Sequence, residues 1–172
     1  MDITELILDD HRELRRLFAV LEEIDAQDVA ALGAVWKRLH GLLDTHAEAE
    51  ERHFYPRLME IGCGANDAPT AADATKDAIE DHNKIRDTAA AVERHAVGSR
   101  EWFDAVGKAN QANSHHMAEE ERQGLTDFRR RATLQERHAL GVRFIAFETR
   151  HLEGVPAVNK DADAYVEAHA PG

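Results

Sequence analysis

A pattern of polar residues that occurs twice constrains this chain more than any other feature. An Asp-His pair is followed by HAEAEER in one copy and by HMAEEER in the other. The first copy contains Asp10, His11, His46 and Glu50, and the second contains Asp81, His82, His116 and Glu120. Equivalent residues have nearly the same separation, since 82 − 11 = 71, 116 − 46 = 70 and 120 − 50 = 70. The pattern therefore indicates a duplicated structural unit.

Apolar residues recur at steps of three and four along most of the chain, which is typical of amphipathic helices. We expect helices over residues 4–25, 28–61, 71–96, 100–131 and 134–152. Asp2 and Glu5 resemble a capping box, Ser99 is a candidate N-cap, and Pro56 should kink the second helix. Residues 65–70 are expected to form a loop, and the tail from Glu153 is expected to be irregular.

Four long helices joined by short connections predict an all-α fold, an antiparallel four-helix bundle. The fifth helix and the irregular tail are additions at the C-terminal end. A chain of 172 residues fits one such core. We therefore assign residues 1–131 to the bundle, and residues 132–172 to a C-terminal helix and tail packed on it.

Composition limits the partners of the protein. The formal net charge of −12 argues against binding to nucleic acid or to an anionic membrane, and solubility is its simplest meaning. No apolar run approaches the length of a membrane span, and no signal peptide is evident. A lone cysteine, Cys63, fits a reducing compartment. We expect a cytoplasmic protein that is a monomer or a weak homodimer.

A histidine and a glutamate four residues apart lie on one helical face and can reach the same metal site. Both HxxxE pairs lie on the apolar stripe of their helix, where an unpaired carboxylate would be costly. The alternative is that the histidines only hydrogen-bond the glutamates in the core, but two matched sets favour a metal. The expected ligands are His11, His46, Glu50, His82, His116 and Glu120.

Four imidazoles and two carboxylates, with no cysteine, suit iron or manganese better than zinc. Two octahedral ions offer about twelve positions, of which the imidazoles and two bridging glutamates would occupy about eight. The others could hold a shared oxygen bridge and external ligands. We therefore expect two Fe ions in an Fe–O–Fe centre, with Mn or Zn as alternatives, and no catalytic residue separate from it.

Several neighbouring residues are possible additional ligands or second-layer groups. His115 competes with His116, but the apolar stripe and the repeat both select His116. His53 lies two turns after His46 and could be a further ligand or a core histidine. Tyr55 could hydrogen-bond or ligate, or simply pack in the core.

Three charged residues near these histidines are ambiguous in the sequence. Arg86 could pair with Glu50 or Glu120, steer an anionic ligand, or form a surface salt bridge, which we take as the default. Asp10 and Asp81 point off the apolar stripe, so we expect them to be surface charges.

The pattern resembles the hemerythrin-like, or HHE cation-binding, family over residues 3–130. The resemblance is carried by His11, by HAEAEERHFYP from His46, by His82, and by HMAEEER from His116. It implies a four-helix bundle with a carboxylate-bridged non-haem di-iron centre that meets oxygen, peroxide or nitric oxide. Oxygen-carrying members have HxxxH on the third helix, whereas here Arg86 follows His82, and their last motif ends in Asp at a longer spacing. The departures favour a more open and reactive centre.

The preferred function is that of a di-iron protein that binds and decomposes a small oxidant, hydrogen peroxide first, in oxidative or nitrosative stress. One alternative is reversible binding or sensing of oxygen or nitric oxide without turnover. Another is an iron donor or buffer for iron–sulfur repair. An apo helical bundle acting as an interaction module would require the duplicated residues to be coincidental.

Overall fold

The computed structural model describes residues 1–156 and 158–171, and eight helices form within them. They are α1 (Ile3–Glu23), α2 (Val29–His53), α3 (Tyr55–Ile61), α4 (Ala71–Val92), α5 (Arg100–Arg122), α6 (Gly124–Arg131), α7 (Leu134–Arg150) and α8 (Ala162–His169). Among the described residues, no helix has the length and apolar character that crossing a lipid bilayer requires.

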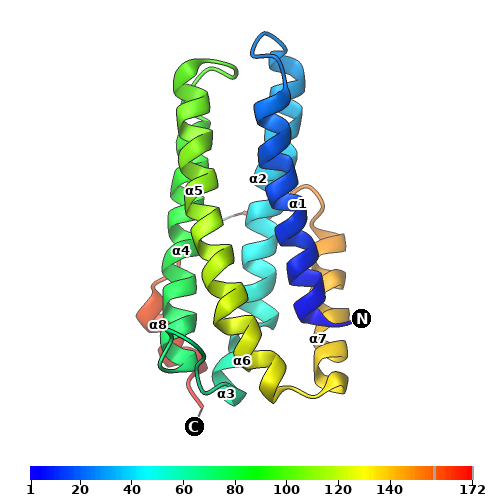
Figure 1. Ribbon diagram of the computed structural model, residues 1–172, viewed down its shortest axis with the longest axis vertical. Helices are drawn as coiled ribbons and strands as arrows, with labels where there is room; N and C mark the ends of the chain where they lie inside the picture. The colour runs from blue at the N-terminus through cyan, green and yellow to red at the C-terminus, as the bar shows by residue number, and fades with distance from the viewer. Residues whose placement is uncertain (157, 172) are drawn as a thin grey trace.

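The four long helices α1, α2, α4 and α5 form the expected antiparallel bundle (Figure 1). The α1–α2 and α4–α5 connections lie together at one end, and the short helices α3 and α6 lie at the other. Helix α7 packs against α1 and α2, whereas α8 packs against α4 and α3. The all-α prediction is confirmed, while the domain boundary between residues 131 and 132 stays a prediction.

Side-chain caps explain where several helices begin. The carboxylate of Asp2 accepts a hydrogen bond from the Thr4 N–H, and the hydroxyl of Ser99 accepts one from the Trp102 N–H. Thr133 and Glu136 form a complete capping box at the start of α7. Each cap satisfies an amide that the helix itself leaves without a partner. The predicted Ser99 cap is confirmed, and Asp2 caps α1 without forming the box with Glu5.

The second and fourth expected helices are each divided in two, at positions that correspond to within one residue, since 123 − 54 = 69. The first break is at Phe54, where Pro56 lacks the N–H that would continue the helix. The second break is at Gln123, and it was not expected because no proline is present. The residue equivalent to Pro56 is Thr126, since 126 − 56 = 70, and its hydroxyl donates to the Glu121 carbonyl at 3.1 Å. A local side-chain bond to the backbone thus accompanies the second break.

The prediction of a wholly irregular tail after Glu153 is wrong, because α8 forms within it. Asp161 caps the helix by accepting a hydrogen bond from the Ala164 N–H at 2.9 Å. Ala162 and Tyr165 then lie buried in the core of the protein. A short helix with only two buried residues has a weak periodic signal, so packing rather than local pattern determines it.

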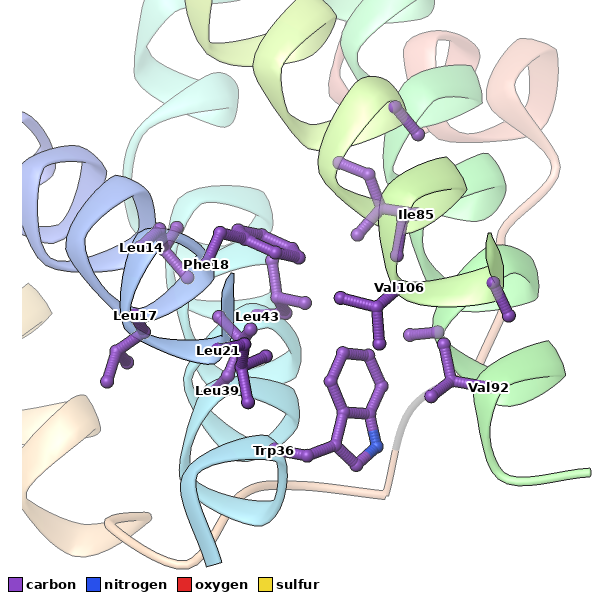
Figure 2. Close-up of a cluster of buried hydrophobic side chains, with 14 of the residues drawn as sticks. Leu14, Leu17, Phe18, Leu21, Trp36, Leu39, Leu43, Ile85, Val92 and Val106 are labelled. Atoms are coloured by element: carbon purple, nitrogen blue, oxygen red, sulfur yellow. The ribbon is translucent and has the colours of Figure 1, made fainter. Parts of the chain in front are cut away.

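The core consists of two apolar clusters with a polar layer between them. The loop-end cluster fills the half of the bundle near the α1–α2 connection, and Figure 2 shows its side chains from α1 and α2 facing those from α4 and α5. It includes Leu14, Phe18, Leu21, Trp36, Leu39, Leu43, Ile85, Val92 and Val106. The terminal-end cluster includes Ile3, Ile7, Phe54, Tyr55, Leu58, Ile79 and Phe128. The buried histidines lie between these clusters along each long helix.

Leu21→Ala should reduce the free energy of unfolding by about 2–5 kcal/mol, because Leu21 is fully buried in the loop-end cluster. Leu152→Ala removes the same atoms from a side chain that is 83% exposed, and should change stability by less than about 0.5 kcal/mol. Chemical denaturation of both variants measures the difference. Equal effects would show that the cluster does not stabilise the bundle.

Candidate metal site

Six side chains of the duplicated pattern meet in the middle of the bundle. Helix α1 supplies one, α2 supplies two, α4 supplies one and α5 supplies two. They are His11, His46, Glu50, His82, His116 and Glu120, and none is more than 5% exposed. All six are the residues expected from the repeated pattern in the sequence. Their roles as metal ligands stay predictions.

Glu50 lies between two groups of potential ligand atoms. His11, His46 and Glu50 form one group, and Glu50, His82 and His116 form the other, with the atoms of each group within 4.8 Å of one another. One Glu50 oxygen is 3.2 Å from His46 Nε2, and the other is 3.3 Å from His82 Nε2. Glu50 is therefore shared by both groups.

Glu120 completes the set on the side of α1 and α3. Its Oε2 is 3.3 Å from His11 Nε2, and its Oε1 accepts a 2.6 Å hydrogen bond from the Tyr55 hydroxyl. Burial alone would raise the pKa of Glu120, but the nearby His11 imidazole and the hydrogen bond from the Tyr55 hydroxyl lower it overall. Burial and the nearby Glu120 raise the pKa of Glu50 well above its usual value. Two carboxylates in one buried layer therefore need positive charge nearby.

Unpartnered polar atoms show that the residues fit a metal. Within the described residues, His11 Nε2, His46 Nε2, both carboxylate oxygens of Glu50 and Glu120 Oε2 are buried without a hydrogen-bond partner. Such atoms are costly unless something binds them. Burial lowers the pKa of His46 and of His116, so both imidazoles stay neutral, the form that binds metal ions.

Two aspartates lie at the outer side of the histidine rings. His46 Nδ1 is 3.1 Å from Asp10 Oδ2, and His116 Nδ1 is 3.9 Å from Asp81 Oδ2. The expectation that Asp10 is a surface charge is wrong. A carboxylate at Nδ1 fixes the tautomer of a metal-binding histidine and directs its Nε2 inward.

The other two histidines are held by glutamates from the opposite helix pair. His11 Nδ1 is 2.9 Å from Glu121 Oε1, and His82 Nδ1 is 2.8 Å from Glu51 Oε1. The glutamates are the last acidic residues of the two repeated motifs. No role was expected for either glutamate, although both are part of the pattern that the sequence repeats.

An arginine holds each of these glutamates. Arg15 Nη2 donates to Glu121 Oε1 at 2.7 Å, and Arg86 Nη2 donates to Glu51 Oε1 at 2.8 Å. The two arginines are also repeated, since 86 − 15 = 71. Arg86 is only 6% exposed, so the expected surface salt bridge is wrong. Burial raises the pKa of Glu51, but the bond from His82 and the charge of Arg86 lower it to about 2.

The residues considered as additional ligands have different environments. Tyr55 is buried beside Glu120, and burial together with the glutamates raises the pKa of its hydroxyl. His53 is half-buried with its ring centroid 5.9 Å from that of Phe147, and it belongs to neither of the two groups that share Glu50. His115 is exposed, and its Nε2 is 3.7 Å from Glu119.

A third group of possible ligand atoms lies behind His46. It contains Asp10, His46 and Glu148 of α7, again within 4.8 Å of one another. Burial and the nearby Asp10 raise the pKa of Glu148 to about 9. Glu148 was not expected near the centre, because no feature of the α7 sequence connects it with the duplicated pattern.

This geometry defines a class of protein: a helical bundle with a buried histidine–carboxylate centre for metal ions. A family model described as the hemerythrin HHE cation binding domain matches residues 2–125. The chain therefore belongs to the hemerythrin HHE cation-binding family. Comparisons with curated proteins and with solved structures gave no match.

Adjacent histidines on α5 provide a matched test of the site. His116→Ala should lower the metal content by about half, because one of the two groups loses a donor. His115→Ala removes an exposed ring next to it and should leave the metal content unchanged. Elemental analysis of both purified variants measures the difference. A larger loss of metal with His115→Ala than with His116→Ala would show that His115, rather than His116, is the ligand.

Glu148→Gln should make the stability of the metal-free protein less dependent on pH. The native state keeps Glu148 protonated up to about pH 9, whereas the unfolded carboxyl titrates near 4.5. Between these two pKa values the native state binds more protons than the unfolded state, so the free energy of unfolding falls as the pH rises. Glu148→Gln removes the titrating carboxyl and should therefore remove this fall in stability. Thermal unfolding at pH 6 and pH 8.5 measures the change. The exposed Glu167→Gln is the control and should follow the unmodified protein.

Proposed function

We propose that the protein holds two iron ions in this centre and decomposes hydrogen peroxide. The observation that supports the iron pair best is the sharing of Glu50 by two groups of buried donors. One carboxylate oxygen faces each group, as expected of a bridging ligand. The family match supports cation binding, and the choice of iron follows from the donors.

All of the donors are imidazole nitrogens or carboxylate oxygens, which bind iron well, and their number rather than their type favours iron over zinc. Cys63 is exposed and is absent from every group of potential ligands among the described residues. Zinc is satisfied by about four ligands, whereas six donors around a shared carboxylate suit a pair of ions with higher coordination numbers. Manganese has similar preferences and is the main competitor.

The space beside the centre fits a very small substrate. A cavity of about 10 Å³ is lined by Tyr55, His116 and Glu120 and by residues of α4 that include Asp81. That volume holds about one water-sized molecule. Hydrogen peroxide, oxygen and nitric oxide are of this size, whereas an organic substrate is not.

Iron bound here would supply Lewis acidity and a change between Fe(II) and Fe(III). The side chains contribute the rest. The two apolar clusters exclude bulk water, the outer carboxylates hold the imidazoles in position, and Tyr55 keeps its hydroxyl proton beside the cavity. In the proposed reaction, two molecules of hydrogen peroxide give one of oxygen and two of water.

Oxygen evolution after addition of hydrogen peroxide to the iron-loaded protein tests the function. We expect catalytic turnover, and we expect His46→Ala to abolish it by removing a donor of the first group. His40→Ala changes another histidine of α2 that lies outside the groups sharing Glu50, and should keep the activity.

Two other results would contradict the proposal. A persistent spectroscopic adduct with no oxygen evolution would indicate a binding protein for oxygen or nitric oxide. Rapid loss of iron to an acceptor, again without turnover, would indicate an iron donor or buffer.

A further inference from the structure

The C-terminal segment brings a lysine to the outer layer of the metal centre. Helix α7 lies beside α1 and α2, whereas α8 lies beside α4 (Figure 1). Lys160 directly precedes the N-cap of α8. These residues lie outside the 2–125 range of the family match, so the family assigns them no role.

Lys160 is fixed to the bundle by both its backbone and its side chain. Its N–H donates to Asn83 Oδ1 at 2.9 Å, and its carbonyl accepts from Asn83 Nδ2 at 2.6 Å. Its Nζ donates to Glu48 Oε2 at 2.8 Å and also forms an ion pair with Glu51 Oε2. The Tyr165 hydroxyl donates to the Glu51 carbonyl and holds α8 at the same place.

The contact matters because Glu51 is the carboxylate that holds His82. The Glu51 side chain is 0% exposed, and its Oε1 accepts from His82 Nδ1 and from Arg86 Nη2, each at 2.8 Å. A continuous series of contacts therefore runs from Lys160 through Glu51 to His82. The Nε2 of His82 lies 3.3 Å from Glu50 Oε2 and 3.0 Å from His116 Nε2, and these three residues form one of the two groups.

The equivalent carboxylate in the other half has no such lysine. Glu121 contacts His11 and Arg15, and its side chain is 32% exposed. Within the described residues, one cation contacts Glu121 and two contact Glu51. The C-terminal segment thus breaks the symmetry of the duplicated centre.

This difference has an electrostatic consequence. A carboxylate at Nδ1 raises the basicity of a metal-binding imidazole. A second cation on that carboxylate draws charge away from the imidazole and adds positive charge near the metal. Both effects favour the lower oxidation state, and burial weakens the screening of both.

We propose that Lys160 is a positioning residue which, through Glu51 and His82, makes the metal ion of the His82–His116 group easier to reduce than that of the His11–His46 group. The inference rests on the proposed function only in requiring that the centre binds two iron ions. It does not require peroxide turnover. The two irons would then be reduced in a fixed order.

Redox titration of the iron-loaded full chain tests the proposal, with iron content measured on the same samples. Two reduction steps are expected in the unmodified protein. Lys160→Met should lower the reduction potential of the first step by about 59 mV. This shift corresponds to about a tenfold change in the ratio of oxidised to reduced iron at a fixed potential. Lys160→Arg keeps the charge and should restore the original value. Lys160→Gln provides a second neutral variant if Lys160→Met fails to fold.

Lys76→Met is the matched control. Lys76 forms a 2.5 Å ion pair with Asp163 of α8, so it also joins α8 to α4, but it does not contact Glu51. It should leave both potentials unchanged. A shift as large as that of Lys160→Met would show that docking of α8, rather than charge at Glu51, sets the potential.

The remaining outcomes separate this proposal from the proposed function. Unchanged potentials in both neutral Lys160 variants, with iron retained, would overturn the positioning role. Two bound irons with unequal potentials but no peroxide turnover would refute only the peroxide reaction. An unmodified protein that binds no iron would overturn both.

Discussion

The arrangement of the polar layer depends on one constraint, the burial of the Glu50 carboxylate in the middle of the bundle. Neither of its oxygens has a hydrogen-bond partner among the described residues, and its side chain is 0% exposed. Isolated charge in such a place is strongly unfavourable, and a second carboxylate, Glu120, lies in the same layer. The bundle therefore gains from a bound cation, and the four histidines stand where donors for that cation are needed.

Apolar packing gives this polar layer its rigidity. The loop-end and terminal-end clusters fix the positions of the four long helices along the bundle axis. The histidine rings therefore meet because of helix packing, and no loop positions them. The outer carboxylates then select the rotation and tautomer of individual rings, as Asp10 does for His46. Because donors on packed helices move little, the site is organised before any ion enters.

The sequence predicted features that depend on local periodicity. The long helices, the Ser99 cap and the six central side chains follow from spacing along single helices. The sequence did not predict which glutamate would contact which histidine across the helix pairs, because these contacts depend on how the helices pack together. Glu51 and Glu121 reach across to the other helix pair, while Asp10 turns inward from a position that looked external. Helix α8 depends on packing against residues distant in the chain, and the break at Gln123 has no proline to mark it in the sequence.

The exchange of glutamates between the helix pairs makes each pair incomplete by itself. One helix pair taken alone would carry a histidine, equivalent to His11, whose carboxylate partner belongs to the other pair. Such a hairpin could complete its centre only by pairing with a second copy of itself. In this chain both copies belong to one polypeptide, so their residues need not be identical. The contact of Lys160 with Glu51 is a difference between the two halves that a symmetric dimer could not have on one side alone.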